Sequence, residues 1–186
     1  LIVRSPMTCE APHGICQRCQ GVSPAGQLHR IGTNVGMRAA QAMSEPLTQF
    51  SLNAKHGGRI TTREEDAKKP EGIKGVRQVL EVPQSFMHRA TLAEHNGVVV
   101  KVEAAPQGGT YVWVDETRLY VPPDLRVTVT PGQRVEAGDT LSDGVPKPDE
   151  VVRHKGLGEG RRYLVDTLHD IYKRSGADID KRHLET

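Results

Sequence analysis

The pattern of apolar and polar positions predicts helices towards both ends of the chain and β-strands between them. Between residues 31 and 43, apolar side chains recur with the spacing of one helix face. Pro46 lacks a backbone donor and crowds the preceding turn, so we expect the helix to be disturbed there. A second, short polar segment is then predicted at 48–56, before the hinge-like pair Gly57 and Gly58. The apolar stripe consists of Ile31, Val35, Ala39, Ala42 and Met43.

Residues 88–145 change to the short period of β-strands. Turn-forming pairs, among them Gly108-Gly109 and Asp115-Glu116, separate the apolar runs. The later spacing G-x-x-V-x-x-G-x-x-L at 132–141 is common in small barrel-sandwich modules. Such modules can carry a modified lysine in a tight hairpin, but this stretch has no hairpin lysine flanked by Met or Val, so a structural β scaffold is predicted. The predicted strands are 98–100, 111–114, 119–121 and 126–129.

Helical spacing flanks the β-rich stretch on both sides. Residues 73–82 form one predicted helix, and a second region starts at Pro148 with a stop signal at Gly156. The strongly charged residues 60–72 are predicted to form a solvated or disordered loop. After Gly156 an apolar stripe, which reads as core or subunit interface, runs until Gly176. Its members are Tyr163, Leu164, Leu168, Ile171 and Tyr172.

Three cysteines lie in the loop-rich first thirty residues. The spacing Cys9-x6-Cys16-x2-Cys19 offers three soft ligands and favours structural zinc over disulfides. Structural zinc takes four ligands, and His13 and His29 are the in-chain candidates for the fourth position. The alternative is a set of buried or free thiols.

Composition restricts the possible core, partners and membrane association only slightly. Aromatic residues make up 4% of the chain, so its core has to be aliphatic and modest. The net charge of +2 does not by itself require a nucleic-acid partner. No apolar run approaches the roughly 20 residues that span a bilayer. Because the chain opens on Leu1 rather than Met, we expect a segment of a longer or split polypeptide.

Three collinear stretches resemble the largest catalytic subunit of multisubunit DNA-dependent RNA polymerase, the β′ subunit of bacteria. NVGMRAAQAMSEPLTQFSLNAKHGGR resembles its trigger-loop region, and VRSPMTCEAPHGICQRCQG resembles its second zinc site. The stretch from Gly144 onward, which begins GVPKPDEVVRHKGLGEGRRYL, is similar to its C-terminal part. This resemblance implies a nucleotidyltransferase that acts only within a complex. It also places the fourth zinc-binding cysteine upstream of this chain.

The resemblance implies roles for residues of the polar segment. His56 matches the histidine that reaches the triphosphate when the loop closes, where imidazole can neutralise charge or donate a proton. Leu52 matches a methionine that packs on the nucleotide base, and Gln49 a glutamine placed to read the ribose hydroxyls. Asn53 replaces an arginine directed at phosphates, so either Lys55 or Arg59 is expected to compensate.

The departures from the family pattern favour a divergent enzyme, with a viral or phage origin as one source. Ser44 and Leu47 replace family glycines beside Glu45-Pro46. The aspartate motif that binds the catalytic Mg²⁺ in this family, NADFDGD, has no counterpart in the sequence. The metal-binding aspartates are therefore expected outside this chain. The rival reading is a non-catalytic, zinc-stabilised nucleic-acid-binding or structural module.

Together these observations predict an α+β chain made of four segments. The expected partners are the remainder of β′, β-like and α- or ω-like subunits, NTP, DNA template and RNA product. The expected location is the cytoplasm near the nucleoid, or a virion for a phage-encoded enzyme. The segments are a zinc-binding region at 1–30, a helix plus trigger-loop hairpin at 31–87, a barrel-sandwich β module at 88–145 and a helical clamp-base region at 146–186.

Overall fold

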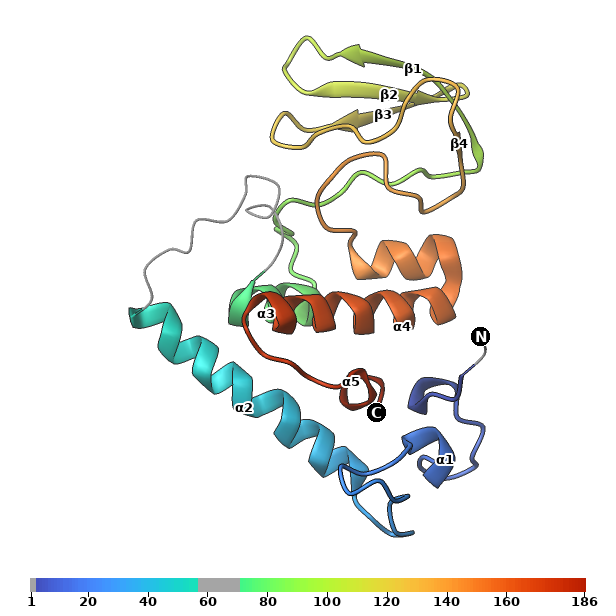
Figure 1. Cartoon of the computed structure of the whole chain (residues 1–186). Coiled ribbons are helices and arrows are strands. Elements are labelled where there is room, and N and C mark those ends of the chain that lie inside the picture. Colours follow the sequence, from blue (N-terminus) through green and yellow to red (C-terminus); the bar gives the residue numbers. More distant parts are fainter. Residues whose placement is uncertain (1–2, 57–70) are drawn as a thin grey trace. The chain divides into compact units, whose positions relative to one another are not determined.

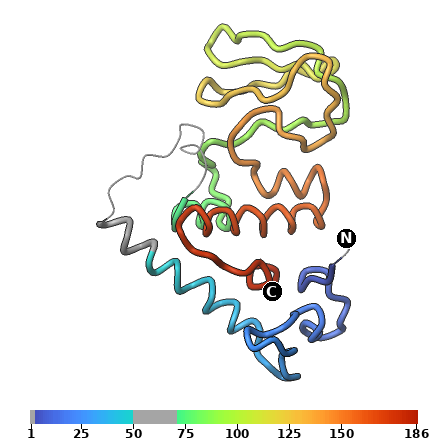
Figure 2. Tube along the Cα trace, in the orientation of Figure 1, coloured from blue at the N-terminus to red at the C-terminus, as the bar shows by residue number. Residues whose placement is uncertain are grey.

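A computed structural model describes residues 3–56 and 71–186, with the side chains of 50–56 left out of the description. The chain divides into two compact units. The first unit combines residues 1–58 with 165–186, and the second comprises residues 59–164. Figures 1 and 2 trace the chain from its N-terminus to its C-terminus.

The second unit contains a curled, four-stranded antiparallel sheet (Figure 1). Its strand order is β3-β2-β1-β4. Two turns expected from the sequence are confirmed: Gly108 and Gly109 connect β1 to β2, and Asp115 adopts φ 49° between β2 and β3. Gly109 is required on steric grounds, because a Cβ there would lie 2.4 Å from the carbonyl oxygen of Val121. The strands are β1 (Gly97–Ala104), β2 (Thr110–Val114), β3 (Thr117–Val121) and β4 (Arg134–Val135).

Alternate residues of the strands point into an aliphatic core, as the sequence composition predicts. Val112 and Val114 of β2 are fully buried, and between them Trp113 lies on the opposite face. One predicted strand, 126–129, is wrong: Val127 makes only an isolated bridge to Ser142, and the regular pairing with β1 is made by β4 instead. The core comprises Ala93, Val99, Val112, Val114, Leu119, Val121, Leu125, Val129, Val135 and Leu141.

The first unit is built around α2 (Val35–His56), which continues through Pro46 as one helix. The prediction of a separate segment at 48–56 is therefore wrong, because the helix does not end at Pro46. A proline inside a helix costs about 3 kcal/mol and removes only one helical hydrogen bond, so other contacts can offset it. Val35, Ala39, Ala42 and Met43 form the packed face as predicted, but Ile31 lies outside the helix and is 89% exposed.

The remaining helices follow the predicted signals closely. Helix α3 spans Gly72–Glu81, and α4 spans Pro148–Arg174 with a kink where Gly156 takes φ 84°. The predicted stripe is confirmed, because Leu168, Ile171 and Tyr172 are buried. The short elements are η1 (Pro6–Thr8), α1 (Gln17–Gln20) and α5 (Lys181–Glu185). No helix in the described parts of the chain is both long and apolar enough to cross a membrane.

Candidate functional site

The three cysteine thiols come together in the first unit. The Sγ atoms of Cys9, Cys16 and Cys19 all lie within 4.8 Å of one another. Cys16 caps the N-terminus of α1, and its Sγ accepts a hydrogen bond from the backbone N–H of Cys19 at 3.4 Å. The Sγ of Cys9 likewise accepts one from the N–H of Cys16 at 3.3 Å. The cysteine loop is thus folded around its sulfur atoms.

This arrangement fits three corners of a tetrahedral zinc site. With Zn–S bonds of about 2.3 Å, tetrahedral sulfurs stand roughly 3.8 Å apart, which agrees with the observed cluster. Hydrogen bonds from the backbone and thiol of Cys19 lower the pKa of Cys16 to about 7. The thiol of Cys19 has a raised pKa, because of its hydrogen bond with Cys16 and its burial. Bound zinc would hold all three as thiolates.

Neither candidate histidine belongs to this cysteine group. His29 Nδ1 instead lies 2.9 Å from Nη1 of Arg38, an interaction that uses the ring nitrogen as an acceptor. His13 is exposed in the loop between Cys9 and Cys16. His13 and His29 are therefore not part of the cluster in the described parts of the chain, and a fourth ligand from outside the chain stays the prediction.

The predicted nucleotide-contacting residues fall mostly on the last two turns of α2. Positions 49, 52, 53 and 56 are spaced i, i+3, i+4 and i+7, so they share one face of the helix. Gln49 is exposed to solvent. The side chains of Leu52, Asn53, Lys55 and His56, and all of Arg59, lie outside the described residues, so their roles stay predictions.

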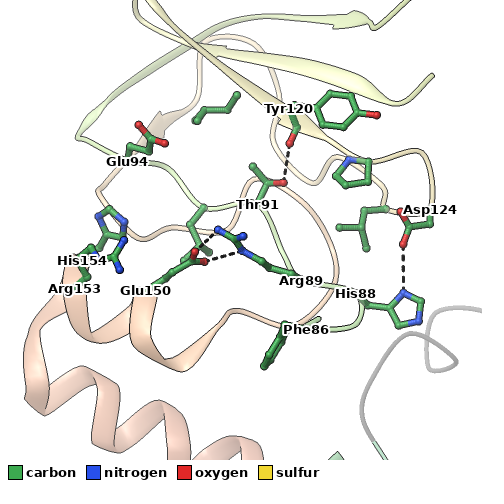
Figure 3. A pocket seen from close by; sticks show the side chains of 14 residues that line it. Phe86, His88, Arg89, Thr91, Glu94, Tyr120, Asp124, Glu150, Arg153 and His154 are labelled. Atoms are coloured by element: carbon green, nitrogen blue, oxygen red, sulfur yellow. Dashed lines mark hydrogen bonds and ion pairs between the residues drawn. The ribbon is translucent and has the colours of Figure 1, made fainter. Parts of the chain in front are cut away.

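A cavity of about 730 Å³ lies beside the β-sheet in the second unit (Figure 3). Gln49 and the three cysteines, the predicted site residues whose side chains the structure describes, do not line it. Two contacts between charged or titratable side chains lie in its lining. The guanidinium of Arg89 makes a two-pronged contact with the carboxylate of Glu150, in the first turn of α4. His88 Nδ1 lies 3.4 Å from Asp124 Oδ2. These contacts join the segment before β1 to α4 and to the loop after β3.

Basic residues near the end of the described chain make ion pairs within it. Lys181 Nζ lies 2.5 Å from Asp166 Oδ1, which raises the lysine pKa. Arg182 contacts Asp180 and donates to two backbone carbonyls of the cysteine loop, those of Gln20 and Val22. The sequence did not predict these contacts between Arg182 and the cysteine loop. Their one local signal is the N-cap residue Asp180, two positions before Arg182.

Comparison with known proteins decides the family. The chain is 32% identical, over 98% of its length, to the β′ subunit of DNA-directed RNA polymerase from Caldanaerobacter subterraneus subsp. tengcongensis. The match to the β′ subunit of Acetivibrio thermocellus has the same identity and coverage, and that of Clostridium tetani is 30% identical. This chain is a relative of the RNA polymerase β′ subunit. The resemblance seen in the sequence is thereby confirmed.

The relationship covers nearly all of this chain but only a small part of each relative. The chain spans about 16% of the length of the β′ subunits that it matches. No protein-family model matches the chain. The cysteine cluster and the α2 helix both lie inside the matched region, since 98% of the chain is covered.

Proposed function

We propose that this chain is part of a β′-like subunit of a DNA-directed RNA polymerase and acts in nucleotidyl transfer only within the assembled complex. The observation that carries the proposal is the identity of about a third to named β′ subunits along 98% of the chain. Partners would be the remainder of β′, the other polymerase subunits, template DNA, RNA product and NTP. The complex would work in the cytoplasm.

In this proposal the end of α2 is the arm that closes over the incoming nucleotide. The shared face of positions 49, 52, 53 and 56 supports this role, because one helix face can meet one ligand. His56 ends α2 and would meet the triphosphate, either neutralising charge or donating a proton. Leu52 would contact the base and Gln49 the ribose. Closure of this kind assembles the site only around a correct substrate.

The metal chemistry is divided between this chain and the rest of the enzyme. Cys9, Cys16 and Cys19 would hold a structural Zn²⁺ together with a fourth ligand from outside the chain. Mg²⁺ would promote phosphoryl transfer by neutralising charge on the reacting oxygens, with its ligands on another part of the polymerase. What this chain adds is positioning. Lys55 or Arg59 would supply the phosphate contact that Asn53 cannot make.

The test is His56→Ala in the assembled polymerase, compared with His13→Ala. His13 is an exposed histidine outside the cysteine group and serves as the control. If His56 transfers a proton, nucleotide addition slows by about 100-fold or more, while DNA binding is retained. Addition at the parental rate with His56→Ala would contradict the proposal. Loss of DNA binding after removal of the cysteines, with addition unaffected by His56→Ala, would favour the zinc-stabilised binding module.

A further inference from the structure

A long-range hydrogen bond joins the C-terminal part of the chain to α2. The hydroxyl of Tyr172, near the end of α4, donates to the backbone carbonyl of Met43 at 2.9 Å. Both residues belong to the first unit, although 129 positions separate them in the sequence. Tyr172 is fully buried, whereas Met43 is half-buried. The bond therefore joins a buried ring of α4 to the backbone of α2.

The bond lies at the one turn of α2 that proline weakens. Pro46 has no N–H to donate to the carbonyl of Ala42, four residues earlier, and its ring crowds that turn. Helices bend most readily where the backbone ladder is interrupted in this way. The carbonyl of Met43 belongs to the same turn, and the phenol of Tyr172 holds it from the side.

The segment around Tyr172 is held by contacts of α5 and by an ion pair with Asp166. The segment that follows α4 contains α5, which packs against α2. Arg182 of α5 donates to the carbonyls of Gln20 and Val22 in the cysteine loop. Lys181 pairs with Asp166 in the same unit. α5 therefore contacts α2 and is linked by side-chain interactions to both the cysteine loop and the end of α4.

We propose that Tyr172 is a positioning residue, which anchors α2 just before Pro46 so that the helix beyond Pro46 moves from a defined base. The inference rests on the proposed function, since it assigns that later part of α2 to nucleotide closure. It adds a division of the helix into an anchored part up to Met43 and a working part from Thr48 to His56. Burial raises the pKa of Tyr172, which keeps the phenol protonated and able to donate throughout the neutral range.

Tyr172→Phe in the assembled polymerase tests the anchor, because it removes the hydroxyl and keeps the ring. Tyr163→Phe is a matched control: that phenol also lies on α4 and donates to a backbone carbonyl, that of Pro146, at 2.5 Å. We expect Tyr172→Phe to lower the maximal rate of single-nucleotide addition by about tenfold, with little change in the NTP concentration needed for half-maximal rate. Tyr163→Phe should keep the parental rate.

A double-mutant cycle with Pro46→Ala separates anchoring from general packing. Alanine at position 46 restores the missing donor and stiffens the turn, so Tyr172→Phe should cost much less in that background. An equal loss in both backgrounds would mean that the hydroxyl acts elsewhere, and would overturn the inference. Parental addition by Tyr172→Phe, in an enzyme that His56→Ala does slow, would overturn it while leaving the proposed function intact. Parental rates with His56→Ala would instead refute the proposed function itself.

Amide hydrogen exchange supplies a readout that does not depend on activity. In the same polymerase, Tyr172→Phe should speed exchange by several-fold at the α2 amides around Met43 and Leu47, where the turn loses its lateral support. Exchange in the β-strands of the second unit provides the internal reference. Unchanged exchange around Met43 would overturn the anchoring role even if the rate falls.

Discussion

The corner of α4 makes a sharp prediction about stability. The chain turns at Gly156, and the two parts of the helix then approach closely at Gly160. A Cβ on Gly160 would lie 2.3 Å from Cγ2 of Val152, and 3.4 and 3.5 Å from its Cβ and Cα. Ordinary carbon–carbon contacts are about 3.5–4.0 Å, so Gly160→Ala forces a displacement of more than about 1 Å. Gly158 offers the matched control, because a Cβ there meets nothing within 4 Å.

The two substitutions should act in opposite directions. Overpacking a core costs about 1–3 kcal/mol. We expect a cost of about 2–3 kcal/mol here, because Val152 is β-branched and its side chain cannot easily rotate away. Replacing glycine by alanine inside a helix returns about 1 kcal/mol. We therefore expect Gly160→Ala to lower the free energy of unfolding by about 1–2 kcal/mol. Gly158→Ala should raise it by about 0.5–1 kcal/mol.

Urea unfolding followed by the fluorescence of Trp113 measures both effects. Trp113 is the only tryptophan and lies in the same unit as the corner. Val152→Ala should relieve most of the cost of Gly160→Ala, because it removes the clashing methyl group. If Gly160→Ala proves as stable as Gly158→Ala, with the same denaturant slope, the close approach does not exist and the helical corner is misassigned.

Three further predictions follow from the electrostatics. In zinc-free protein near pH 7, iodoacetamide should label Cys16 faster than Cys19, as mass spectrometry can show, and zinc should protect both. Burial lowers the pKa of His183 below its ordinary value of 6.5, so the unfolded state binds a proton at a higher pH than the folded state does. Melting curves should therefore show that stability falls as the pH drops through about 6.5. The fall should be smaller in His183→Gln. Glu150→Gln should destabilise by about 1–2 kcal/mol in urea unfolding, whereas Glu81→Gln, in an exposed pair, should stay within about 0.5 kcal/mol.

The sequence predicts those elements whose signals are local. The turns at Gly109 and Asp115 are confirmed, and both residues have positive φ angles. Glycine and aspartate tolerate such angles better than most residues, so their presence signals a turn. The stop at Gly156 is likewise confirmed, as a kink with positive φ. The closeness of the three thiols follows the cysteine spacing. In each case a few neighbouring residues determine the outcome, so long-range packing has little scope to change it.

Predictions fail where distant contacts decide between local alternatives. Residues 126–129 have β-forming side chains, yet single bonds to the 141–143 stretch replace a regular ladder. His29 has the chemistry of a zinc ligand, but it lies outside the cysteine group and contacts Arg38 through its Nδ1 atom. The roles given to residues 49–59 come from family resemblance rather than from local spacing. They stay predictions until the polymerase variants are measured.

Pro46 shows why the same residue can be read wrongly from sequence and still matter for function. Local rules predict a break, because proline removes a donor and crowds the turn. The helix nevertheless continues, and a tyrosine far along the chain donates to the neighbouring carbonyl of Met43. The turn at Pro46 is weakened by the missing donor and supported by the hydroxyl of Tyr172. It therefore keeps helical geometry and is also the place where the helix bends most readily. A regular helix without proline would supply the geometry alone, so the weakness at Pro46 and the anchor at Tyr172 make sense only together.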